Sequence, residues 1–336
     1  MIIQIKQSIT EDQKNQLYTV LNENKYAITE VKTQAENYLV CIGKKEIDIR
    51  TIGNMAGVKD VHIVSDSYKL VSTKWKVHNT VIDLGDGVTI GGNDTSIMAG
   101  PCSVESEVQM QKIVEHLIKN NIRIMRGGVF KPRSSPYAFR GAGVEGLKMM
   151  HSLCEPHGIK IITEVMQVSQ IEEMMPYVDI FQVGARNSQN FNLLDSLGEI
   201  DKPVLIKRGI SGTIEELLHS AEYVFSKGNE KLLLCERGIR TFETAYRNTF
   251  DINAIQVLKE KTHLPVIADP SHGVGIRNYV AKLALASLIS GADGVIYEVH
   301  EKPEEALSDG QQTLNFFESE QLVSKINALL ISGICR

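Results

Sequence analysis

The sequence predicts an α/β protein in which a (β/α)8 TIM barrel follows a small α+β domain of the ferredoxin-like kind. Two observations support the barrel: eight short runs of aliphatic and β-branched residues recur from Thr95 onward, and turns and helical segments separate them. Strands that alternate with helices in this way form a parallel sheet buried on both faces. Eight such units over roughly 250 residues fit a closed barrel better than an open doubly wound sheet.

The N-terminal residues follow a different pattern, with elements in the order strand, helix, strand, strand, helix, strand. This order is typical of the ferredoxin-like split βαβ arrangement. We therefore expect a separate domain at residues 1–66, a linker at 67–78 and the barrel at 79–336. From the pattern alone, the small domain could sense a ligand, brace the barrel or mediate assembly. Its expected strands are "MIIQIK", "AITEVKTQ", "NYLVCIG" and "VKDVHIV", and its expected helices are "TEDQKNQLYTVLNENK" and "KEIDIRTIGNMAG".

The barrel segment divides into eight units. The expected strands are "TSIMAG", "IRIMRG", "IKIITEV", "VDIFQVG", "KPVLIKRG", "KLLLCERG", "LPVIADP" and "DGVIYEV". Stretches with the helical period of hydrophobic residues lie between them, such as "SEVQMQKIVEHLIKNN", "VEGLKMMHSLCEPHG" and "NYVAKLALASLISG". The segment "NTVIDLGDGVTIGG" (79–92) predicts a hairpin around Gly85–Gly87 that plugs the lower end of the barrel.

Composition excludes several classes of protein. The chain has 336 residues, a formal net charge of −5 and 43% hydrophobic residues, which is typical of an ordinary globular protein. The mild acidity argues against a nucleic-acid binder or a membrane-surface binder. No apolar run is long enough for a transmembrane helix, and the N-terminus lacks the apolar core of a signal peptide. Five scattered cysteines without a CxxC motif indicate reduced thiols in a cytoplasmic protein.

Charged residues gather where the predicted strands end, which is where the active site of a (β/α)8 barrel lies. Since several of these strands are interior, a cluster of cations there is tolerable only around anions such as phosphate and carboxylate groups. There are more cations than one phosphate requires, so we expect either two phosphorylated substrates or one phosphate with a carboxylate and a second phosphate. The seven cations are Arg126, Lys131, Arg133, Arg186, Lys207, Arg208 and Arg237, and the acids Glu164, Glu236 and Asp269 fall at the same rim.

The stretch "MRGGVFKPRSSPYAF", which follows the second predicted strand, carries the densest group of cations and hydroxyls. Pro132 stiffens the backbone between Lys131 and Arg133, so the two cations can face different parts of a site. Ser134 and Ser135 offer hydroxyl and backbone donors to a phosphate, although either serine could instead start a helix. Lys131, deep among other cations, is the candidate for proton transfer.

A second group of side chains has the composition of a metal site. Its members come from the ends of the first, seventh and eighth predicted strands and from the loop after the eighth: Cys102, His272, Glu298 and Asp309. The first and eighth strands become neighbours when a barrel closes, so these residues should converge. A thiolate, an imidazole and two carboxylates suit Mn²⁺, Fe²⁺, Co²⁺ or Zn²⁺. Each residue alone has an ordinary structural interpretation, and only their joint placement favours a metal.

The motifs "AGPCSVES", "RGGVFKPRSSPYAF", "QVGARN", "LIKRG", "CERG", "DPSHGVG" and "YEVH…SDGQQ" resemble those of 3-deoxy-D-arabino-heptulosonate-7-phosphate (DAHP) synthase, in the same order. The match is to the smaller type I branch, which carries an N-terminal ferredoxin-like regulatory domain. One departure is Ser134, where the family usually has threonine. The resemblance implies a metal-dependent condensation of phosphoenolpyruvate with erythrose 4-phosphate, the first step of the shikimate pathway to aromatic amino acids.

The resemblance also implies a role for each candidate residue. Around phosphoenolpyruvate it places Arg126, Lys131 and Lys207 at the carboxylate region and Arg186 and Arg237 at the phosphate. At the phosphate of erythrose 4-phosphate it places Arg133 and Ser134. As metal ligands it implies Cys102, His272, Glu298 and Asp309. Lys131 or a metal-bound water would give a proton to the new alkoxide. A tyrosine or phenylalanine inhibitor at the N-terminal domain and a homotetramer are further expectations of the family.

Two other functions compete with this one. 3-Deoxy-D-manno-octulosonate-8-phosphate synthase runs the same chemistry on arabinose 5-phosphate, but its loop reads more like KANRSS than the "KPRSS" found here, and it typically lacks an N-terminal domain. A non-catalytic amino-acid sensor, with the barrel as a scaffold, should have lost some of the site residues. All of them are present, which disfavours the sensor.

Overall fold

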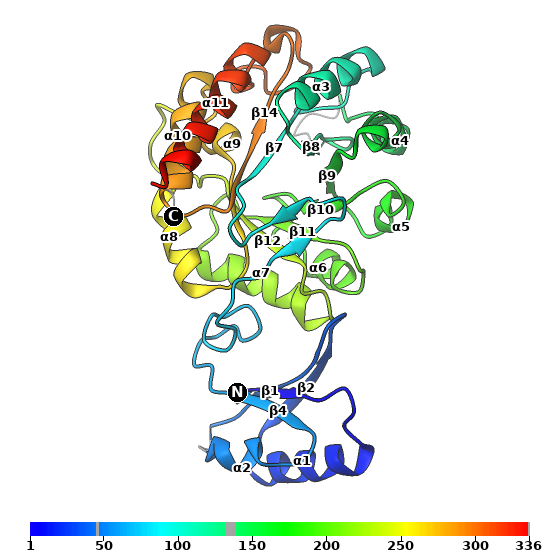
Figure 1. The fold of residues 1–336 in the computed structure, drawn as a ribbon, viewed down its shortest axis with the longest axis vertical. Coiled ribbons are helices and arrows are strands. Elements are labelled where there is room, and N and C mark those ends of the chain that lie inside the picture. Colours follow the sequence, from blue (N-terminus) through cyan, green and yellow to red (C-terminus); the bar gives the residue numbers. More distant parts are fainter. Residues whose placement is uncertain (45–46, 132–136, 138, 335–336) are drawn as a thin grey trace.

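The structure is a computed structural model of the chain and describes residues 1–44, 47–131, 137 and 139–334. It has two parts, a small sheet with two helices at the N-terminus and a closed barrel above it (Figure 1). Both match the predicted fold class. Within the described residues, no helix is long and apolar enough to cross a membrane.

The N-terminal part is a four-stranded antiparallel sheet in the order β2-β3-β1-β4. Side chains alternate along β1: Ile3 packs with Leu17 and other residues of the two helices, whereas Ile2 belongs to the core on the opposite face. This is the predicted ferredoxin-like arrangement. Its elements are β1 (Ile2–Ile5), α1 (Glu11–Glu23), β2 (Ala27–Lys32), β3 (Asn37–Ile42), α2 (Ile49–Gly53) and β4 (Val58–His62).

The second part is a barrel of eight parallel strands that follow one another around the ring, and the pairing of the last strand with the first closes it. Each strand is hydrogen-bonded to the next along the chain, as the repeated pattern predicted. The strands are β7 (Ser96–Gly100), β8 (Ile124–Arg126), β9 (Lys160–Val165), β10 (Ile180–Val183), β11 (Val204–Lys207), β12 (Leu232–Glu236), β13 (Val266–Ala268) and β14 (Gly294–Glu298).

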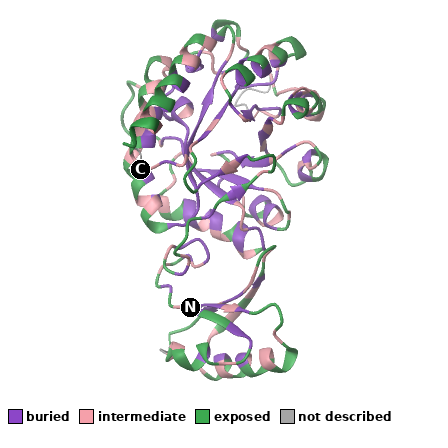
Figure 2. Cartoon of the chain, viewed as in Figure 1, coloured by how far each residue is buried: buried purple, intermediate pink, exposed green. Residues whose placement is uncertain are grey.

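Helices surround the barrel and bury its outer face, so the strands are buried on both sides (Figures 1 and 2). Along β9, for example, Ile161 packs outward against the helices and Ile162 packs inward. The helices are α3 (Glu107–Lys119), α4 (Gly143–Cys154), α5 (Gln170–Met174), α6 (Phe191–Gly198), α7 (Ile214–Ser226), α8 (Ile252–Lys261), α9 (Pro270–Val274), α10 (Arg277–Ile289) and α11 (Phe316–Ser332), with 3-10 turns at Glu155–His157 and Pro303–Glu305.

A short hairpin plugs the lower end of the barrel, as predicted. Strands β5 (Ile82–Asp83) and β6 (Thr89–Ile90) pair antiparallel. Ile82, Val88 and Ile90 are buried in one cluster with the inward-facing residues of the barrel strands. Because apolar side chains fill the barrel from below, only the carboxyl ends of the strands are left to form a polar site.

The segment between the two parts is tied to the barrel by polar and aromatic contacts. The half-buried carboxylate of Glu222 on α7 accepts hydrogen bonds from the backbone N–H groups of residues 69, 70 and 71, at 2.9, 2.9 and 3.1 Å. The Trp75 indole donates to the Leu70 carbonyl over 2.8 Å and packs edge-on against Tyr38 of β3. Trp75 also packs against Phe225 of α7, so one aromatic cluster joins the small sheet, the connecting segment and the barrel.

Candidate active site

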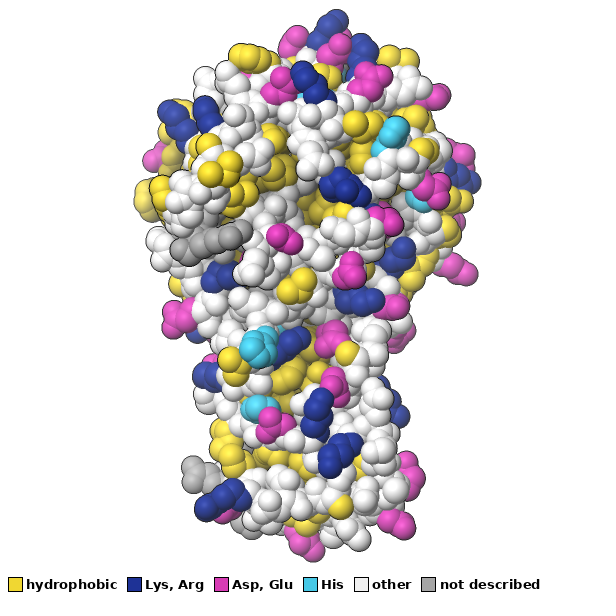
Figure 3. Space-filling view, in the orientation of Figure 1, with side chains coloured by type: hydrophobic (Ala, Val, Ile, Leu, Met, Phe, Trp, Pro, Cys, Tyr) yellow, Lys and Arg dark blue, Asp and Glu magenta, His cyan; other side chains and the backbone are white. Residues whose placement is uncertain are grey.

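A cavity of about 230 Å³ opens at the carboxyl ends of the barrel strands. Cations are the most frequent side chains in its lining. Two acids, Glu164 and Asp309, and the imidazole of His272 also line it. On the face drawn in Figure 3, positive and negative side chains are interspersed, so that surface carries no broad patch of one sign. The cations of this cavity, called the cation-lined cavity below, are Arg126, Lys131, Arg186, Lys207, Arg237, Arg240 and Arg247.

Two of the predicted substrate-binding cations contact the predicted metal ligands directly. The guanidinium of Arg126, at the end of β8, donates from Nη1 to the Pro101 carbonyl over 2.7 Å and to Glu298 Oε1 over 3.2 Å. The Lys131 ammonium lies 2.9 Å from the Cys102 carbonyl oxygen and 3.1 Å from Cys102 Sγ. Both cations therefore lie between the cavity and these ligands.

Three further predicted cations line the cavity from the next strands. Lys207 ends β11 and donates to Asp269 over 2.5 Å. Arg237 follows β12 and is buried, and its Nη1 donates to a backbone carbonyl, that of Gly238, at 3.3 Å. Burial lowers the pKa of the Arg237 guanidinium. Among the described residues no carboxylate forms an ion pair with Arg186 or Arg237, and both line the cavity.

The prediction for Arg208 was wrong. Its guanidinium donates to Glu236 and to Asp251, each over 2.9 Å, and it does not line the cavity. Successive residues at the end of a strand point in opposite directions, so when Lys207 faces the cavity Arg208 must face the surrounding helices. Glu236, expected at the same rim, is its buried partner and is likewise absent from the cavity lining.

Two cations of the cavity were missed by the sequence analysis. Arg240 and Arg247 lie in the loop between β12 and α8, which folds back through an isolated bridge between Ile239 and Thr249. Arg247 donates from Nη1 to Asp309 over 3.2 Å and to Gln312 over 2.8 Å. A signal was present, because two arginines in one long βα loop of a barrel are candidates for the site.

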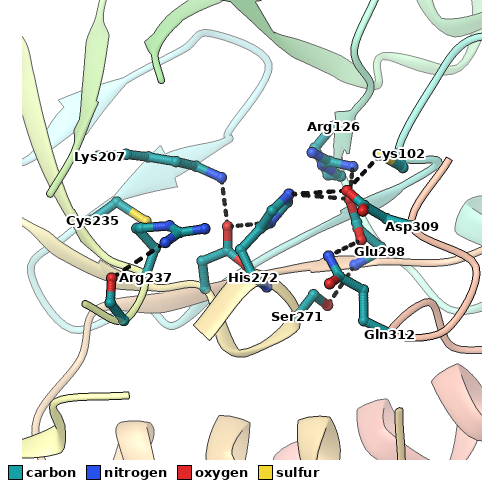
Figure 4. A network of polar contacts seen from close by, with 12 residues as sticks. Cys102, Arg126, Lys207, Cys235, Arg237, Ser271, His272, Glu298, Asp309 and Gln312 are labelled. Carbon is teal, nitrogen blue, oxygen red and sulfur yellow. Dashed lines mark hydrogen bonds and ion pairs between the residues drawn. The ribbon is translucent and has the colours of Figure 1, made fainter. Parts of the chain in front are cut away.

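The structure brings together the four predicted metal ligands, called the four-donor cluster below (Figure 4). Ligand atoms of Cys102, Glu298 and Asp309 all lie within 4.8 Å of one another. Cys102 Sγ is 3.3 Å from Asp309 Oδ2, and His272 Nε2 is 3.4 Å from Glu298 Oε1 and 3.9 Å from Asp309 Oδ2. One sulfur, one nitrogen and carboxylate oxygens that converge in a partly buried space fit a divalent transition-metal ion.

The cluster has a mixed electrostatic character. Burial, with a smaller effect from Glu298, raises the pKa of the Cys102 thiol to about 12, and Lys131 only partly opposes this. Burial also raises the pKa of Asp309, but His272 and Arg247 outweigh it and bring that pKa down to about 2. The carboxylate is therefore charged and the thiol protonated at neutral pH, so a metal ion that binds the sulfur must displace a proton.

Two predicted site residues, Arg133 and Ser134, lie outside the described residues, as do Pro132 and Ser135. Their proposed contacts with a sugar phosphate stay predictions. Lys131, just before them, is described and lines the cavity. The four cysteines of the described residues, Cys41, Cys102, Cys154 and Cys235, are all free, as expected for reduced thiols.

The family model of the DAHP synthetase I family matches residues 75–330. A phospho-2-dehydro-3-deoxyheptonate aldolase of Thermotoga maritima is 46% identical over 272 residues, which cover 81% of this chain and 80% of the relative. A 2-dehydro-3-deoxyphosphooctonate aldolase of Syntrophotalea carbinolica is 31% identical over 262 residues, which cover 72% of this chain and 93% of that protein.

Solved structures show the same likeness. The crystal structure of a phospho-2-dehydro-3-deoxyheptonate aldolase (DAHP synthase) from Thermotoga maritima superposes with a TM-score of 0.79 at 40% identity, covering 99% of this chain and 98% of the other. A truncated form of 3-deoxy-D-arabino-heptulosonate 7-phosphate synthase from the same organism gives a TM-score of 0.75 at 43% identity and covers 80% of this chain and 98% of the other. The first likeness includes the N-terminal sheet as well as the barrel.

Proposed function

The chain belongs to the DAHP synthetase I family, and on that premise we propose that it condenses phosphoenolpyruvate with erythrose 4-phosphate to give DAHP and phosphate. This makes it a transferase of aldol type, a 3-deoxy-7-phosphoheptulonate synthase. The observation that carries the proposal is the adjacency of the cation-lined cavity and the four-donor cluster, which share Lys131 and Arg126 as neighbours. The product is the first intermediate of the shikimate pathway to aromatic amino acids.

Phosphoenolpyruvate would occupy the cation-lined cavity. In this proposal Arg186 and Arg237 hold its phosphate, the role that the family motif gives them. In support, both line the cavity and neither forms an ion pair with a carboxylate of the described residues. Guanidinium groups bind phosphate through paired N–H donors, and a buried cation without an ion-pair partner, such as Arg237, gains most from an anion. The carboxylate region of phosphoenolpyruvate would be bound by Arg126, Lys131 and Lys207.

The four-donor cluster would hold a divalent metal ion through Cys102, His272, Glu298 and Asp309, with Mn²⁺, Fe²⁺, Co²⁺ and Zn²⁺ as the candidates. When bound, such an ion supplies Lewis-acid polarisation of the sugar aldehyde. The phosphate of erythrose 4-phosphate would be held by Arg133 and Ser134, an assignment that rests on their place in the family motif.

The reaction then proceeds between two substrates that the protein holds in place. Carbon 3 of phosphoenolpyruvate attacks the aldehyde carbon, and the new alkoxide takes a proton. Lys131 is the proposed donor, because its ammonium lies 3.1 Å from Cys102 Sγ, at the boundary between the cavity and the cluster. Water adds at carbon 2, and phosphate leaves by cleavage of the C–O bond. Cations around the cavity stabilise the charge that develops on the phosphate.

Regulation and assembly form a second part of the proposal. We expect tyrosine or phenylalanine to inhibit the enzyme through the N-terminal sheet and the chain to assemble as a homotetramer. Support comes from the ferredoxin-like fold of residues 2–62 and from the aromatic cluster around Trp75, which packs that sheet against the barrel.

An assay of phosphate release tests the function. Purified protein, supplied with divalent metal and phosphoenolpyruvate, should turn over with erythrose 4-phosphate and not with arabinose 5-phosphate. Preference for the five-carbon sugar would instead assign the activity of a 2-dehydro-3-deoxyphosphooctonate aldolase, the name of the relative that is 31% identical. An absence of turnover with either sugar, despite bound metal, would favour a non-catalytic sensor.

A further inference from the structure

Asp269, the residue after β13, contacts both Lys207, which lines the cation-lined cavity, and His272 of the four-donor cluster. It is only 1% exposed. Its Oδ2 accepts a hydrogen bond from the Lys207 ammonium over 2.5 Å and lies 2.8 Å from His272 Nδ1. Its Oδ1 accepts from the backbone N–H of His272 over 3.0 Å and so caps the short helix α9. One carboxylate therefore contacts a cavity cation and a cluster ligand at once.

These contacts determine which nitrogen of His272 carries the proton. An ionised carboxylate can only accept hydrogen bonds, so the Nδ1 that faces Asp269 must be the protonated nitrogen of a neutral ring. The lone pair is then on Nε2, the atom that lies 3.4 Å from Glu298 Oε1 and 3.9 Å from Asp309 Oδ2. A histidine binds a metal ion only through a nitrogen with a free lone pair.

We propose that Asp269 is a positioning residue that links Lys207 in the cavity to His272 in the cluster and holds the imidazole as its Nδ1–H tautomer. The inference rests on the proposed function in one respect, because it takes the cluster to bind a metal ion. Lys207 keeps the charge of Asp269 compensated in its buried position, so the same contact serves the substrate side and the metal side.

Asparagine at this position separates the proposed role from a structural one. Its side chain caps a helix as well as aspartate does. If its oxygen keeps the cap on the His272 N–H, its NH₂ group must face Lys207 and His272 Nδ1. That NH₂ group donates, which forces Nδ1 to accept and moves the ring proton to Nε2. The opposite orientation of the amide loses the cap, so neither orientation satisfies all three contacts.

The first test compares the affinity of the metal-free full chain for Zn²⁺ by equilibrium dialysis. We expect Asp269→Asn to bind about 10–100-fold more weakly than wild type. The matched control is Asp293→Asn, at the other end of the same strands, where the carboxylate accepts from Lys259 and from the Val266 backbone N–H. The control should bind Zn²⁺ within about twofold of wild type. Equal binding by wild type and Asp269→Asn would overturn the role of Asp269, whereas no binding by wild type would overturn the metal site itself.

The second test reads the tautomer directly and needs no metal. Histidine ¹⁵N spectra of metal-free protein at about pH 9, where an ordinary imidazole is neutral, would be assigned with His272→Gln. We expect the wild type to carry the proton on Nδ1 of His272, and Asp269→Asn to carry it on Nε2. A wild-type ring protonated on Nε2 would overturn the proposal, and this holds even if the variant does not fold.

Discussion

The side-chain amide of Gln312 donates a hydrogen bond to Glu298 Oε2 over 2.7 Å, behind the four-donor cluster. Gln312 is fully buried, and its Oε1 accepts from Arg247 over 2.8 Å. The Gln312 amide is thus bonded through both its nitrogen and its oxygen, and the other carboxylate oxygen of Glu298, Oε1, faces His272 and Arg126. Groups that hold a metal ligand from behind are expected to tune metal affinity.

Gln312→Leu should therefore weaken metal binding about tenfold or more, because it leaves Glu298 Oε2 and the Arg247 guanidinium without this partner. Equilibrium dialysis against Zn²⁺ measures the effect. Gln111→Leu is the matched control, since Gln111 is exposed on α3 and also donates to a glutamate, Glu107, at 3.3 Å. Equal losses in the two variants would show that Gln312 has no specific role at the cluster.

Cys102→Ser should sharply reduce metal affinity and turnover, because a serine hydroxyl is a far poorer ligand than a thiolate for a soft or borderline ion. Cys235→Ser serves as the control, since Cys235 is also a buried cysteine but lies within β12 and packs in the apolar interior of the barrel. That variant should lose stability and keep its metal. Near-normal turnover of Cys102→Ser in metal-supplemented assays would remove Cys102 from the ligand set.

Two neighbouring arginines should respond in opposite ways to the same substitution. Arg237→Met should raise the free energy of unfolding of the substrate-free protein, because it removes a buried cation that has no carboxylate partner. The same substitution should raise the KM for phosphoenolpyruvate at least about tenfold. Arg208→Met breaks a buried ion pair with Glu236 and a partly buried one with Asp251, and should lower the free energy of unfolding by about 3–5 kcal/mol. Denaturant unfolding and steady-state kinetics measure both. Destabilisation by Arg237→Met with an unchanged KM would contradict an anion site there.

Acid should destabilise the fold through His263, which joins the connecting segment to the barrel. Its Nε2 donates to the Leu70 carbonyl over 2.9 Å, and its Nδ1 lies 2.8 Å from the Thr80 hydroxyl. Burial, with a smaller effect from Lys76, lowers the pKa of His263 to about 3. The unfolded chain binds this proton near pH 6.5, so stability is complete above that pH and falls by about 1.4 kcal/mol for each pH unit down to the folded pKa.

Denaturant unfolding at several pH values between 7 and 4, in wild type and in His263→Gln, isolates this effect from that of other groups. The difference in unfolding free energy between the two proteins should shrink as the pH falls below about 6.5. A difference that does not change with pH would show that His263 is not held neutral by burial.

The fold could be predicted because each repeated unit has a recognisable local pattern of hydrophobic residues. Eight aliphatic runs indicated the barrel, and the segment 79–92 around Gly85–Gly87 indicated the hairpin plug. The four-donor cluster could be predicted for a related reason: closure of the barrel makes β14 and β7 neighbours, which brings Glu298 and Cys102 together.

The errors have physical causes as well. The direction of a side chain at the end of a strand depends on one residue of register, which the sequence does not fix, so Arg208 was placed in the cavity with Lys207. The path of the loop that carries Arg240 and Arg247 depends on tertiary contacts such as the bond to Gln312. The sequence placed Asp269 at the carboxyl ends of the predicted strands. Only the structure shows that its carboxylate contacts both Lys207 and His272.

The most direct test of the central claim is a crystal structure of the full chain with Mn²⁺ and phosphoenolpyruvate. We predict an anomalous peak ligated by Cys102, His272, Glu298 and Asp309, with the substrate phosphate on Arg186 and Arg237. Metal bound elsewhere, or phosphoenolpyruvate bound away from the cation-lined cavity, would contradict the account.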